Sequence, residues 1–543
     1  MSKVAAYLQE HIQGEVTTNA AILDAKSRDM SVLRIAPEMV IYPRVTNDIR
    51  KVARFSWQLA EKGHVLPITV RGGGNDQTGA AIGKGIALVT TAHMNRVFEL
   101  APKQKLVRVQ PGVSISALST ALSLHGMGIP PLMGEASGHT IGGMIGNNSG
   151  AYLSGKYGKV GSWIHQMEVV LANGDVLQTG RISKRELSKK KGQQDFEGEI
   201  YRSLDNLIED NSELIENSIA GGAIGNVGYA AIADVKQKDG SFDLAPLIAG
   251  SQGTLGIVSE MIMRVEFVSS HMTVALLAFS GREQARDALD GLKSFEPAIL
   301  EMYDGELFNM AAEQGKIYEF YKELNGNVGS VILIGFDDFS DRARQKHVKK
   351  VARLLKDTDA FMVTGDGDEA EELLTIRGVM ASLFNPAGKD VSAPPLFDNA
   401  YIPSERYEDF AAAVRALGEK HHVSLPLAGK ILEDTYTTRP QLHLHKVGDK
   451  QKVFKLLDEY GAIVAAHNGY LIGADGEGRV KAPFAHKQLD DDIKALFEAI
   501  KNVFDPHGIL NPGVKQAAEL RSLVSALRTD YDIAASSDYA SYN

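Results

Sequence analysis

The chain has 543 residues, of which 44% are hydrophobic and 23% charged, values ordinary for a globular protein. Lys and Arg number 58 against 68 Asp and Glu, and the resulting net charge of −10 argues against a general nucleic-acid binder. There is no cysteine, which excludes disulfides, thiolate zinc sites, cysteine-ligated iron–sulfur clusters and a cysteinyl bond to flavin.

The chain starts with MSKVAAYLQEHIQGEV, which lacks the apolar core of a signal peptide. Its apolar stretches, such as residues 85–89 and 462–466, are too short to span a bilayer. We therefore expect a cytoplasmic protein. A peripheral position on the inner face of a membrane stays open.

Short β-branched runs between glycine and proline residues predict strands at 65–70, 86–90, 107–109 and 167–172. Amphipathic patterns predict helices at 47–61 and 114–125. Residues 184–191 are basic apart from Glu186. We interpret this stretch as a solvated loop, with a contact to anionic lipid or a partner as the alternative.

A second pattern begins near residue 270. Strands at 271–279 and 330–336 alternate with helices at 283–293 and 341–355, which predicts a compact α+β unit. The pattern recurs with a strand at 399–403 and helices at 405–417 and 453–460. A last helix at 489–503 ends at Pro506 and Gly508, and residues 517–543 are expected to form a partly helical tail with a mobile end.

Three glycine-rich segments are the first candidates for a ligand-binding site. Residues 71–79, RGGGNDQTG, follow an apolar strand, where glycines let the backbone approach an anion closely. No GK[ST] follows and no G-x-G-x-x-G opens a helix, which excludes a Walker loop and a Rossmann fingerprint. The other two segments are 137–160, SGHTIGGMIGNNSGAYLSGKYGKV, and 247–260, LIAGSQGTLGIVSE. Taken alone, a glycine run is as often a tight turn as a ligand site.

In this order, the segments resemble the flavin-binding domain of the vanillyl-alcohol oxidase superfamily, from about residue 34 to 265. RGGGNDQTG resembles the family's RGGGTSxxG pyrophosphate loop, and VQPGV, TIGGMIGNNSG, NVGYAAI and GSQGTLGIVSE resemble later elements. The resemblance implies an α+β fold. A two-part FAD-binding domain would span residues 1–269, an α+β substrate (cap) domain with an antiparallel sheet 270–484, and a C-terminal helical segment packing back on the FAD domain 485–543.

The resemblance also implies how FAD is held. Backbone amides of the 71–79 loop should cradle its pyrophosphate, and the other two segments should line the path to the flavin ring. Some relatives tether flavin through a histidine near this loop; here Asn75 stands there and His139 is interpreted as a polar contact, so we expect non-covalent FAD. The expected FAD contacts are Arg71, Gly72, Gly73, Gly74, Asn75, Asp76, Thr78, Gly79, Pro111, Gly112, Gly138, Thr140, Gly142, Gly143, Asn147, Ser149, Gly150, Gly253, Thr254, Gly256, Ile257, Val258 and Asn511.

Beyond residue 270 the chain is similar to the D-2-hydroxyacid dehydrogenase branch, which includes D-lactate and D-2-hydroxyglutarate dehydrogenases and the flavin subunit of glycolate oxidase. The similar segments are ELLTIRGVMASLF, LFDNAYIPSERYEDF, TRPQLHLH, GADGEGRVKAPF and FDPHGILNPG. Arg377 matches the arginine that grips the substrate carboxylate, a role suited to a planar guanidinium, with a structural ion pair as the alternative. Further cleft candidates are Tyr436, Arg439, His467 and Asn468.

The branch's metal-binding histidine motif is altered, and two alignments of it fit. One places Lys430 and Thr437 at the histidine positions, and the other places Thr438 and His445 there. Neither restores both histidines. His443 and His445 are interpreted as strand residues on one face, with metal ligation as the less favoured alternative.

In the second metal motif, Ala474 replaces the glutamate and Asp475 the histidine that usually accepts the substrate proton. Lysine and alanine do not rebuild a metal cage, so no metal is expected. In one interpretation, Lys430 replaces the cation, Asp475 takes the hydroxyl proton while hydride leaves for flavin N5, and the two form a buried pair. In the other, the site has decayed or been retuned.

The sequence therefore predicts an FAD-dependent dehydrogenase or oxidase of a small 2-hydroxy acid such as D-lactate. A quinone or a protein would accept the electrons, and a homo-oligomer stays open. One alternative is oxidation of another alcohol, such as a sugar, without a metal. A second is a flavin-bearing electron-transfer subunit without substrate turnover.

Overall fold

The N-terminal part of the chain forms two sheets. The computed structural model describes residues 3–134, 138–222, 224–383, 391–516 and 519–529. In the first sheet β2, β4 and β3 are parallel and β1 is antiparallel to β2, with bounds β1 Glu15–Thr17, β2 Met39–Tyr42, β3 Ile68–Arg71 and β4 Ile86–Val89. The second sheet is antiparallel in the order β5-β6-β10-β8-β9, with bounds β5 Val97–Ala101, β6 Leu106–Val109, β8 Ile164–Val170, β9 Val176–Gln178 and β10 Ile257–Arg264. A two-stranded ribbon pairs β7 Met127–Gly128 with β11 Glu266–Phe267.

A seven-stranded antiparallel sheet follows, in the order β15-β12-β14-β13-β17-β18-β16. Its strands are β12 Thr273–Phe279, β13 Ile299–Asp304, β14 Ser330–Phe336, β15 Phe361–Asp366, β16 Phe397–Tyr401, β17 Ala428–Lys430 and β18 Thr435–Thr438. Every residue of β12 and β14 is buried, which explains why both read as continuous apolar runs rather than alternating ones.

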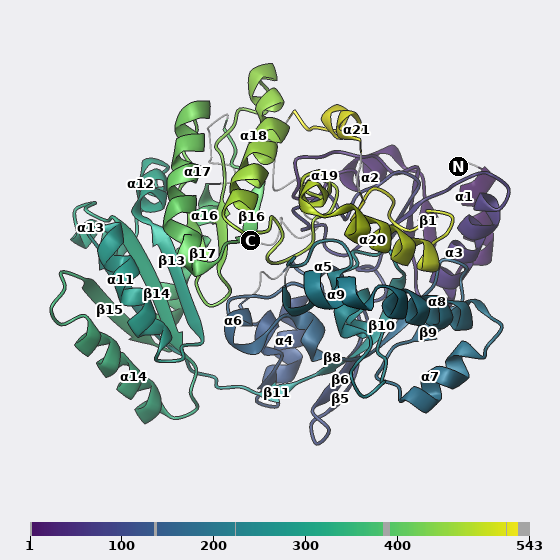
Figure 1. Cartoon of the computed structure of the whole chain (residues 1–543), viewed down its shortest axis with the longest axis horizontal. Coiled ribbons are helices and arrows are strands. Elements are labelled where there is room, and N and C mark those ends of the chain that lie inside the picture. Colours follow the sequence, from purple (N-terminus) through teal and green to yellow (C-terminus); the bar gives the residue numbers. More distant parts are fainter. Residues whose placement is uncertain (1–2, 135–137, 223, 384–390, 517–518, 530–543) are drawn as a thin grey trace.

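Helices cover these sheets (Figure 1). Those of the first half are α1 Lys3–His11, α2 Ala20–Ala25, α3 Thr46–Ala60, α4 Ile115–Ser123, α5 Ile141–Asn147, α6 Ser154–Tyr157, α7 Lys184–Lys191, α8 Phe196–Asp210, α9 Ser212–Ser218 and α10 Ala245–Ile248. Those of the second half are α11 Arg282–Lys293, α12 Gly305–Glu313, α13 Glu319–Glu323, α14 Asp341–Leu354, α15 Asp368–Leu374, α16 Val379–Ser382, α17 Tyr407–His421, α18 Val447–Ala466, α19 Ala482–Ala485, α20 Asp491–Phe504 and α21 Leu520–Ser525. The predicted α+β class with an antiparallel cap sheet is confirmed.

The end of the chain returns to the N-terminal half, where α20 packs beside α8 (Figure 1). The buried ammonium of Lys501 on α20 donates to the Thr254 carbonyl at 2.7 Å and to Asp505 Oδ2 at 2.6 Å. These bonds bring a segment from the far end of the sequence against the loop that precedes β10.

Two local predictions are wrong, and one helix is longer than predicted. Residues 184–191 form helix α7 instead of a loop, because Ser183 and Glu186 make a capping box that satisfies the first backbone amides. The helix predicted at 453–460 is part of the 20-residue α18, which continues through Gly461. His443 and His445 lie in a turn before α18, after a single bridge at Leu442, and not in a strand.

Two further predictions concern the tail and the membrane. Of the predicted tail, α21 is helical, whereas 517–518 and 530–543 lie outside the described residues. Within the described part of the chain, every helix is too short or too polar to cross a bilayer.

A buried ion pair fastens the segment after the cap sheet. Glu477 is fully buried and accepts from Lys515 Nζ at 2.9 Å, from His486 Nε2 at 3.1 Å and from the Gly228 amide at 2.9 Å. Burial raises the pKa of this carboxyl. Lys515 and His486 lower the pKa by more than burial raises it, and the result is a pKa of about 2. The carboxylate therefore stabilises the fold above its unfolded pKa of 4.5, and this contribution is lost as the pH falls toward 2.

We expect Glu477→Gln to lower stability by about 3 kcal/mol at neutral pH, because it leaves Lys515 buried without its partner. Thermal melting of the variant and the wild type at several pH values measures the effect. The difference in Tm should be largest above pH 5 and shrink in acid. The exposed Glu498→Gln on α20 is the control; a pH-independent difference would contradict the assignment.

Candidate active site

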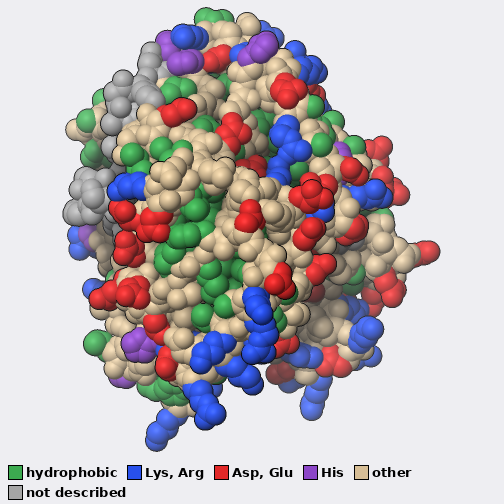
Figure 2. Space-filling view, turned by 90° about the vertical axis from the view of Figure 1, so that its left-hand side faces the viewer, with side chains coloured by type: hydrophobic (Ala, Val, Ile, Leu, Met, Phe, Trp, Pro, Cys, Tyr) green, Lys and Arg blue, Asp and Glu red, His purple; other side chains and the backbone are tan. Residues whose placement is uncertain are grey.

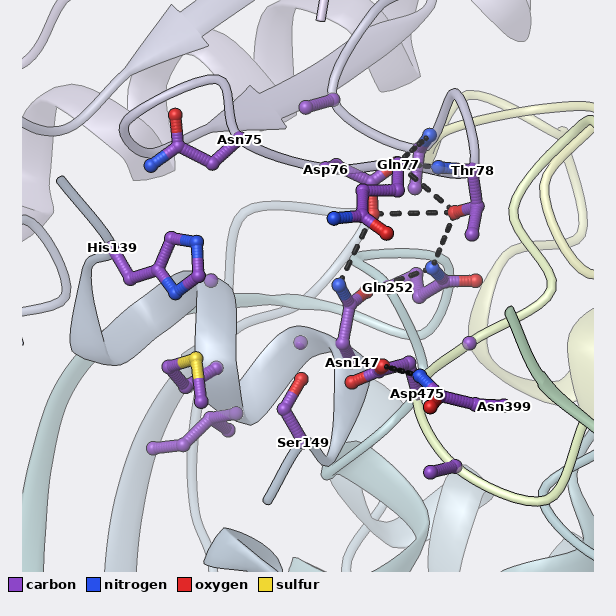
Figure 3. Close-up of a pocket in the computed structure, with 18 of the residues that line it drawn as sticks. Asn75, Asp76, Gln77, Thr78, His139, Asn147, Ser149, Gln252, Asn399 and Asp475 are labelled. Carbon is purple, nitrogen blue, oxygen red and sulfur yellow. Dashed lines mark hydrogen bonds between the residues drawn. The ribbon is translucent and has the colours of Figure 1, made fainter. Parts of the chain in front are cut away.

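One cavity of about 400 Å³ separates the glycine-rich segments from the cap sheet. The glycine loop after β3, helix α5 and the loop before β10 form one side of it. Strands β13, β16, β17 and β18 and the segment 474–476 form the other. Figure 3 shows the polar side chains that converge on it from these segments.

The loop at 71–79 presents backbone amides to the cavity. Gly72, Gly73 and Gly74 line it, and none of their N–H groups donates a hydrogen bond to another described residue. Gly74 has a φ of +74°, which favours glycine, and a Cβ there would overlap the guanidinium of Arg71. Three unsatisfied amides at one concave surface fit an anionic group such as the pyrophosphate of FAD.

Helix α5 packs closely against Pro111, and the contact is made by a glycine of the helix. A Cβ on Gly142 would lie 2.6 Å from Cβ of Pro111, so only glycine permits this approach. Thr140 caps the helix by accepting from the Gly143 amide at 3.2 Å. The helix then ends at Asn148, whose left-handed φ of 48° turns the chain toward Ser149.

A polar network connects the glycine loop with the other segments (Figure 3). Asp76 accepts from the amides of Thr78 and Ala80 at 2.9 and 2.7 Å, and from Asn147 Nδ2 at 3.1 Å. Gln252 donates to Asn147 Oδ1 at 2.8 Å and accepts from the Gly478 amide at 2.9 Å. Asp76 lines the cavity, and its carboxylate is used to hold the 71–79 loop in its conformation.

Below the loop lies a second, fully buried network. Arg479 donates to the Gly79 carbonyl at 2.6 Å and to Asn511 Oδ1 at 2.9 Å. Asn511 donates in turn to the carbonyls of Ala80 and Gln252 at 2.9 and 2.8 Å. Asn511 therefore supports the loop from behind instead of lining the cavity.

Asp475 faces the cavity in a defined orientation (Figure 3). Its Oδ2 accepts from Asn399 Nδ2 at 2.7 Å, and its backbone carbonyl accepts from Asn226 at 3.2 Å. The backbone amide of Asn399 donates to Thr437 Oγ1 at 3.0 Å. Asp475 and Asn399 both have left-handed backbones, with φ of 59° and 58°. A carboxylate oriented toward a cavity in this way can act as a proton acceptor.

Lys430 lines the same cavity from β17, but its predicted ion pair with Asp475 is not formed. Its ammonium donates instead to the carbonyls of Gly150 and Ala151, at 3.1 and 3.4 Å. Lys159 lies against the same segment and donates to the Gly473 carbonyl at 2.8 Å. Burial lowers the pKa of Lys159, while the carboxylates of Glu433 and Asp475 raise it.

Arg377 lines the cavity and is also part of an ion pair. Its Nε lies 3.0 Å from Oε2 of the buried Glu301, and its guanidinium lies 4.5 Å from the ring centre of Tyr152. Tyr303 donates to the same Glu301 oxygen at 2.6 Å. Arg377 thus forms a structural ion pair while it lines the cavity, and its grip on a substrate carboxylate stays a prediction.

Arg439 is neutralised in a similar way. Its Nε lies 3.0 Å from Oδ1 of Asp398, and both residues line the cavity. Lys481 lies nearby and donates to the Asp398 carbonyl at 2.5 Å. Burial lowers the pKa of Lys481, against the carboxylates of Asp398 and Asp475, which raise it.

The structure brings most of the predicted residues to this one cavity. Those that line it are Gly72, Gly73, Gly74, Asn75, Asp76, Thr78, Pro111, Thr140, Gly142, Gly143, Asn147, Ser149, Gly150, Gly253, Gly256, Ile257, Val258, Arg377, Lys430, Arg439 and Asp475, with His139. Those that do not are Arg71, Gly79, Gly112, Gly138, Thr254, Tyr436, His467, Asn468 and Asn511.

Three of the cleft candidates lie away from the cavity. Tyr436 is buried and stacks on Tyr407 at 4.6 Å, because its β18 side chain points into the cap core. His467 ends helix α18, where its Nδ1 bonds the Ile463 carbonyl, and Asn468 occupies the left-handed turn that follows. These positions are set by the cap core and the helix end.

The structure distinguishes the two alignments of the altered metal motif. Lys430 and Thr437 line the cavity beside Asp475, whereas Thr438 is buried behind it and His445 lies in the turn before α18. A lysine ammonium offers a cation no electron pair. Among the residues that the structure describes, no three His, Asp or Glu side chains are grouped as metal ligands would be. We therefore derive no step through a metal.

Sequence reasoning missed several residues of the site. Gln252 and Asn399 stand within segments that resemble the family, but no role was expected for them. Glu301 and Tyr303 belong to β13, a strand that the sequence did not predict. A buried acid in an otherwise apolar run, ILEMYD, was the available signal, because buried carboxylates need partners.

Two family profiles match the chain. The profile described as FAD binding domain matches residues 37–180. The profile described as FAD linked oxidases, C-terminal domain, matches residues 268–514.

Relatives match over nearly the whole chain at low identity. D-2-hydroxyglutarate dehydrogenase of Haemophilus influenzae is 24% identical over 555 residues, covering 96% of this chain and 53% of that protein. The chain thus spans about half the length of that relative. The glycolate oxidase subunit GlcD of Bacillus subtilis is 24% identical over 495 residues, covering 91% of this chain and 92% of the relative.

Among solved structures, a 4-ethylphenol oxidase from Gulosibacter chungangensis, in complex with isoeugenol, aligns with a TM-score of 0.67 at 17% identity. The alignment covers 95% of this chain and 97% of the oxidase. This likeness shows the fold.

We expect Gly142→Ala to weaken FAD binding at least about tenfold, because overpacking against Pro111 costs about 1–3 kcal/mol and displaces α5 from the cavity wall. The ratio of flavin to protein absorbance after dialysis measures retention. Gly448→Ala on α18, where a Cβ meets nothing within 4 Å, is the matched control. Equal retention in the two variants would show that α5 does not help to hold the cofactor.

Proposed function

The chain belongs to the FAD-linked oxidase family, and from this membership we propose that it holds FAD in the cavity and oxidises a small 2-hydroxy acid such as D-lactate. The observation that carries the proposal is the place of Asp475. Its oriented carboxylate faces the same cavity as the unsatisfied amides of the glycine loop. This arrangement supports a proton acceptor and an anion cradle in one cavity.

We propose that FAD is bound without a covalent tether. The chain has no cysteine, and Asn75 stands in the glycine loop where some relatives have a histidine. The loop, helix α5 and the segment before β10 supply backbone contacts along the cavity. His139 lines the cavity and serves as a polar contact.

In the proposed reaction, Asp475 removes the proton from the substrate hydroxyl. When bound, FAD would supply the acceptor for the hydride that leaves the substrate carbon. Asn399 keeps the Asp475 carboxylate oriented toward the cavity by donating to Oδ2. Lys430, whose ammonium donates to the carbonyls of Gly150 and Ala151, supplies a positive charge for the substrate carboxylate. A quinone or a protein then accepts the electrons.

A second candidate function rests on the neutralised arginines. Glu301 compensates Arg377 and Asp398 compensates Arg439, so neither guanidinium offers a full positive charge to a carboxylate. This charge balance favours an uncharged alcohol, such as a sugar, over a hydroxy acid. Arg377 would then help to shape the cavity rather than grip an anion.

We expect Asp475→Asn to slow flavin reduction by substrate by about 10²–10⁴-fold, because the amide accepts no proton. Anaerobic bleaching of the flavin is followed with D-lactate, D-2-hydroxyglutarate, glycolate and a panel of sugars. FAD content, measured as flavin released by acid, should stay unchanged, as it should in the exposed control Asp409→Asn. Unchanged reduction in Asp475→Asn would remove this residue from the mechanism, and bleaching by no substrate would favour an electron-transfer subunit.

The two candidate substrates are separated by Glu301→Gln. Removing this carboxylate takes away one negative charge beside Arg377, so KM for a 2-hydroxy acid should fall about tenfold, equivalent to roughly 1.4 kcal/mol of binding. KM for an uncharged alcohol should stay constant. Stopped-flow reduction measured across substrate concentrations gives both values. An unchanged KM for every hydroxy acid that reduces the flavin would argue that Arg377 does not bind the carboxylate.

A further inference from the structure

Helix α14 lies at the outer end of the cap sheet, far from the cavity side of that sheet (Figure 1). It packs against β12 and beside α11. Its inner face buries Val351 and Arg344, and Arg344 is paired with Asp366 at 3.3 Å. The side chains on the inner face of α14 therefore have their packing and ion-pair partners within the cap.

The outer face of α14 is made of cations. Positions 342, 346, 349 and 353 recur every three or four residues, so they form one row opposite the buried face. A 14-residue helix makes this row about 20 Å long. The cations of the row and its margins, which we call the α14 cationic face, are Arg342, Lys346, Lys349, Lys350, Arg353 and Lys356. Figure 2 shows Lys and Arg side chains gathered at the lower end of this side of the molecule, where α14 lies.

These charges have no acidic partners. Within the described residues, no member of the α14 cationic face takes part in an ion pair or a side-chain hydrogen bond, and Lys350 lies only over the ring of Phe295, at 5.6 Å. The basic helix α7 differs, because Lys190 and Lys191 are paired with Glu197 and Asp205. In a chain of net charge −10, an uncompensated row of cations concentrates attraction for anions at one place.

Exposed apolar side chains stand at both ends of the row. Phe339 is 72% exposed two residues before the helix, and Leu354 is 40% exposed at its last residue. A convex row of cations flanked by exposed apolar groups matches a lipid surface. Phosphates attract the cations, and the apolar groups enter the headgroup boundary.

We propose that the α14 cationic face docks the protein on a membrane surface rich in anionic phospholipid. The negative charge of the rest of the chain is repelled by such a surface, so the contact also fixes the orientation of the molecule. The proposal does not depend on the substrate or on the reaction in the cavity.

The test is co-sedimentation of the FAD-loaded full chain with vesicles of phosphatidylglycerol and phosphatidylcholine. The triple variant Lys346→Gln, Lys349→Gln, Arg353→Gln should bind about 100-fold more weakly, from roughly fivefold per cation. The matched control is Lys184→Gln, Arg185→Gln, Lys189→Gln on α7, which removes the same charge from another exposed helix and should bind like the wild type. Phe339→Ser should weaken binding without altering its salt dependence.

Binding should be absent on vesicles of phosphatidylcholine alone and should be lost at about 0.5 M salt, where the Debye length is only a few ångströms. Failure of the wild type to sediment with the anionic vesicles would overturn the proposal. So would equal weakening by the α7 and α14 triple variants. Binding to soluble polyglutamate instead of vesicles, dependent on α14, would identify an acidic macromolecule as the partner and would also overturn it.

Discussion

The buried guanidinium of Arg479 holds the glycine-rich loop to the end of the chain, and the cavity depends on this contact. Arg479 reaches the Gly79 carbonyl and Asn511, and Asn511 reaches two further carbonyls of the same wall. Burial lowers the pKa of Arg479 to about 10, so the group remains charged at neutral pH. A backbone rich in glycine has much conformational freedom to lose, and a rigid donor that binds its carbonyls fixes it in one shape.

From this fixed loop, polar contacts extend across the cavity. Asp76, Asn147 and Gln252 connect the loop with α5 and with the segment that carries Asp475. Asn399 then orients Asp475 from the cap sheet. Because each group satisfies another, the protein's own contacts hold the two sides of the cavity in register, which favours preorganisation of the site.

Charge is distributed differently inside and outside the protein. In the cavity, Arg377 and Arg439 are each held by a carboxylate, so burial of the cations is compensated. At the surface, Lys190 and Lys191 of α7 are paired with neighbouring acids, whereas within the described residues the α14 cationic face forms no ion pair. The number of basic residues in a segment therefore does not determine the electrostatic potential at its surface, because the acidic partners of those residues come from other elements.

The sequence by itself determined the FAD-binding architecture and the altered catalytic motif. Gly74 of the 71–79 loop is required by its own backbone, which has a φ of +74°, so the sequence alone indicates a turn there. Buried strands such as β12 and β14 are equally visible as apolar runs. Only the tertiary structure decided which side chains meet. It placed Lys430 and Thr437, and not Thr438 and His445, beside Asp475, it turned Tyr436 into the cap core, and it brought Glu301 to Arg377. The physical reason is that these contacts join residues distant in sequence, through strand pairing and burial that no local pattern records.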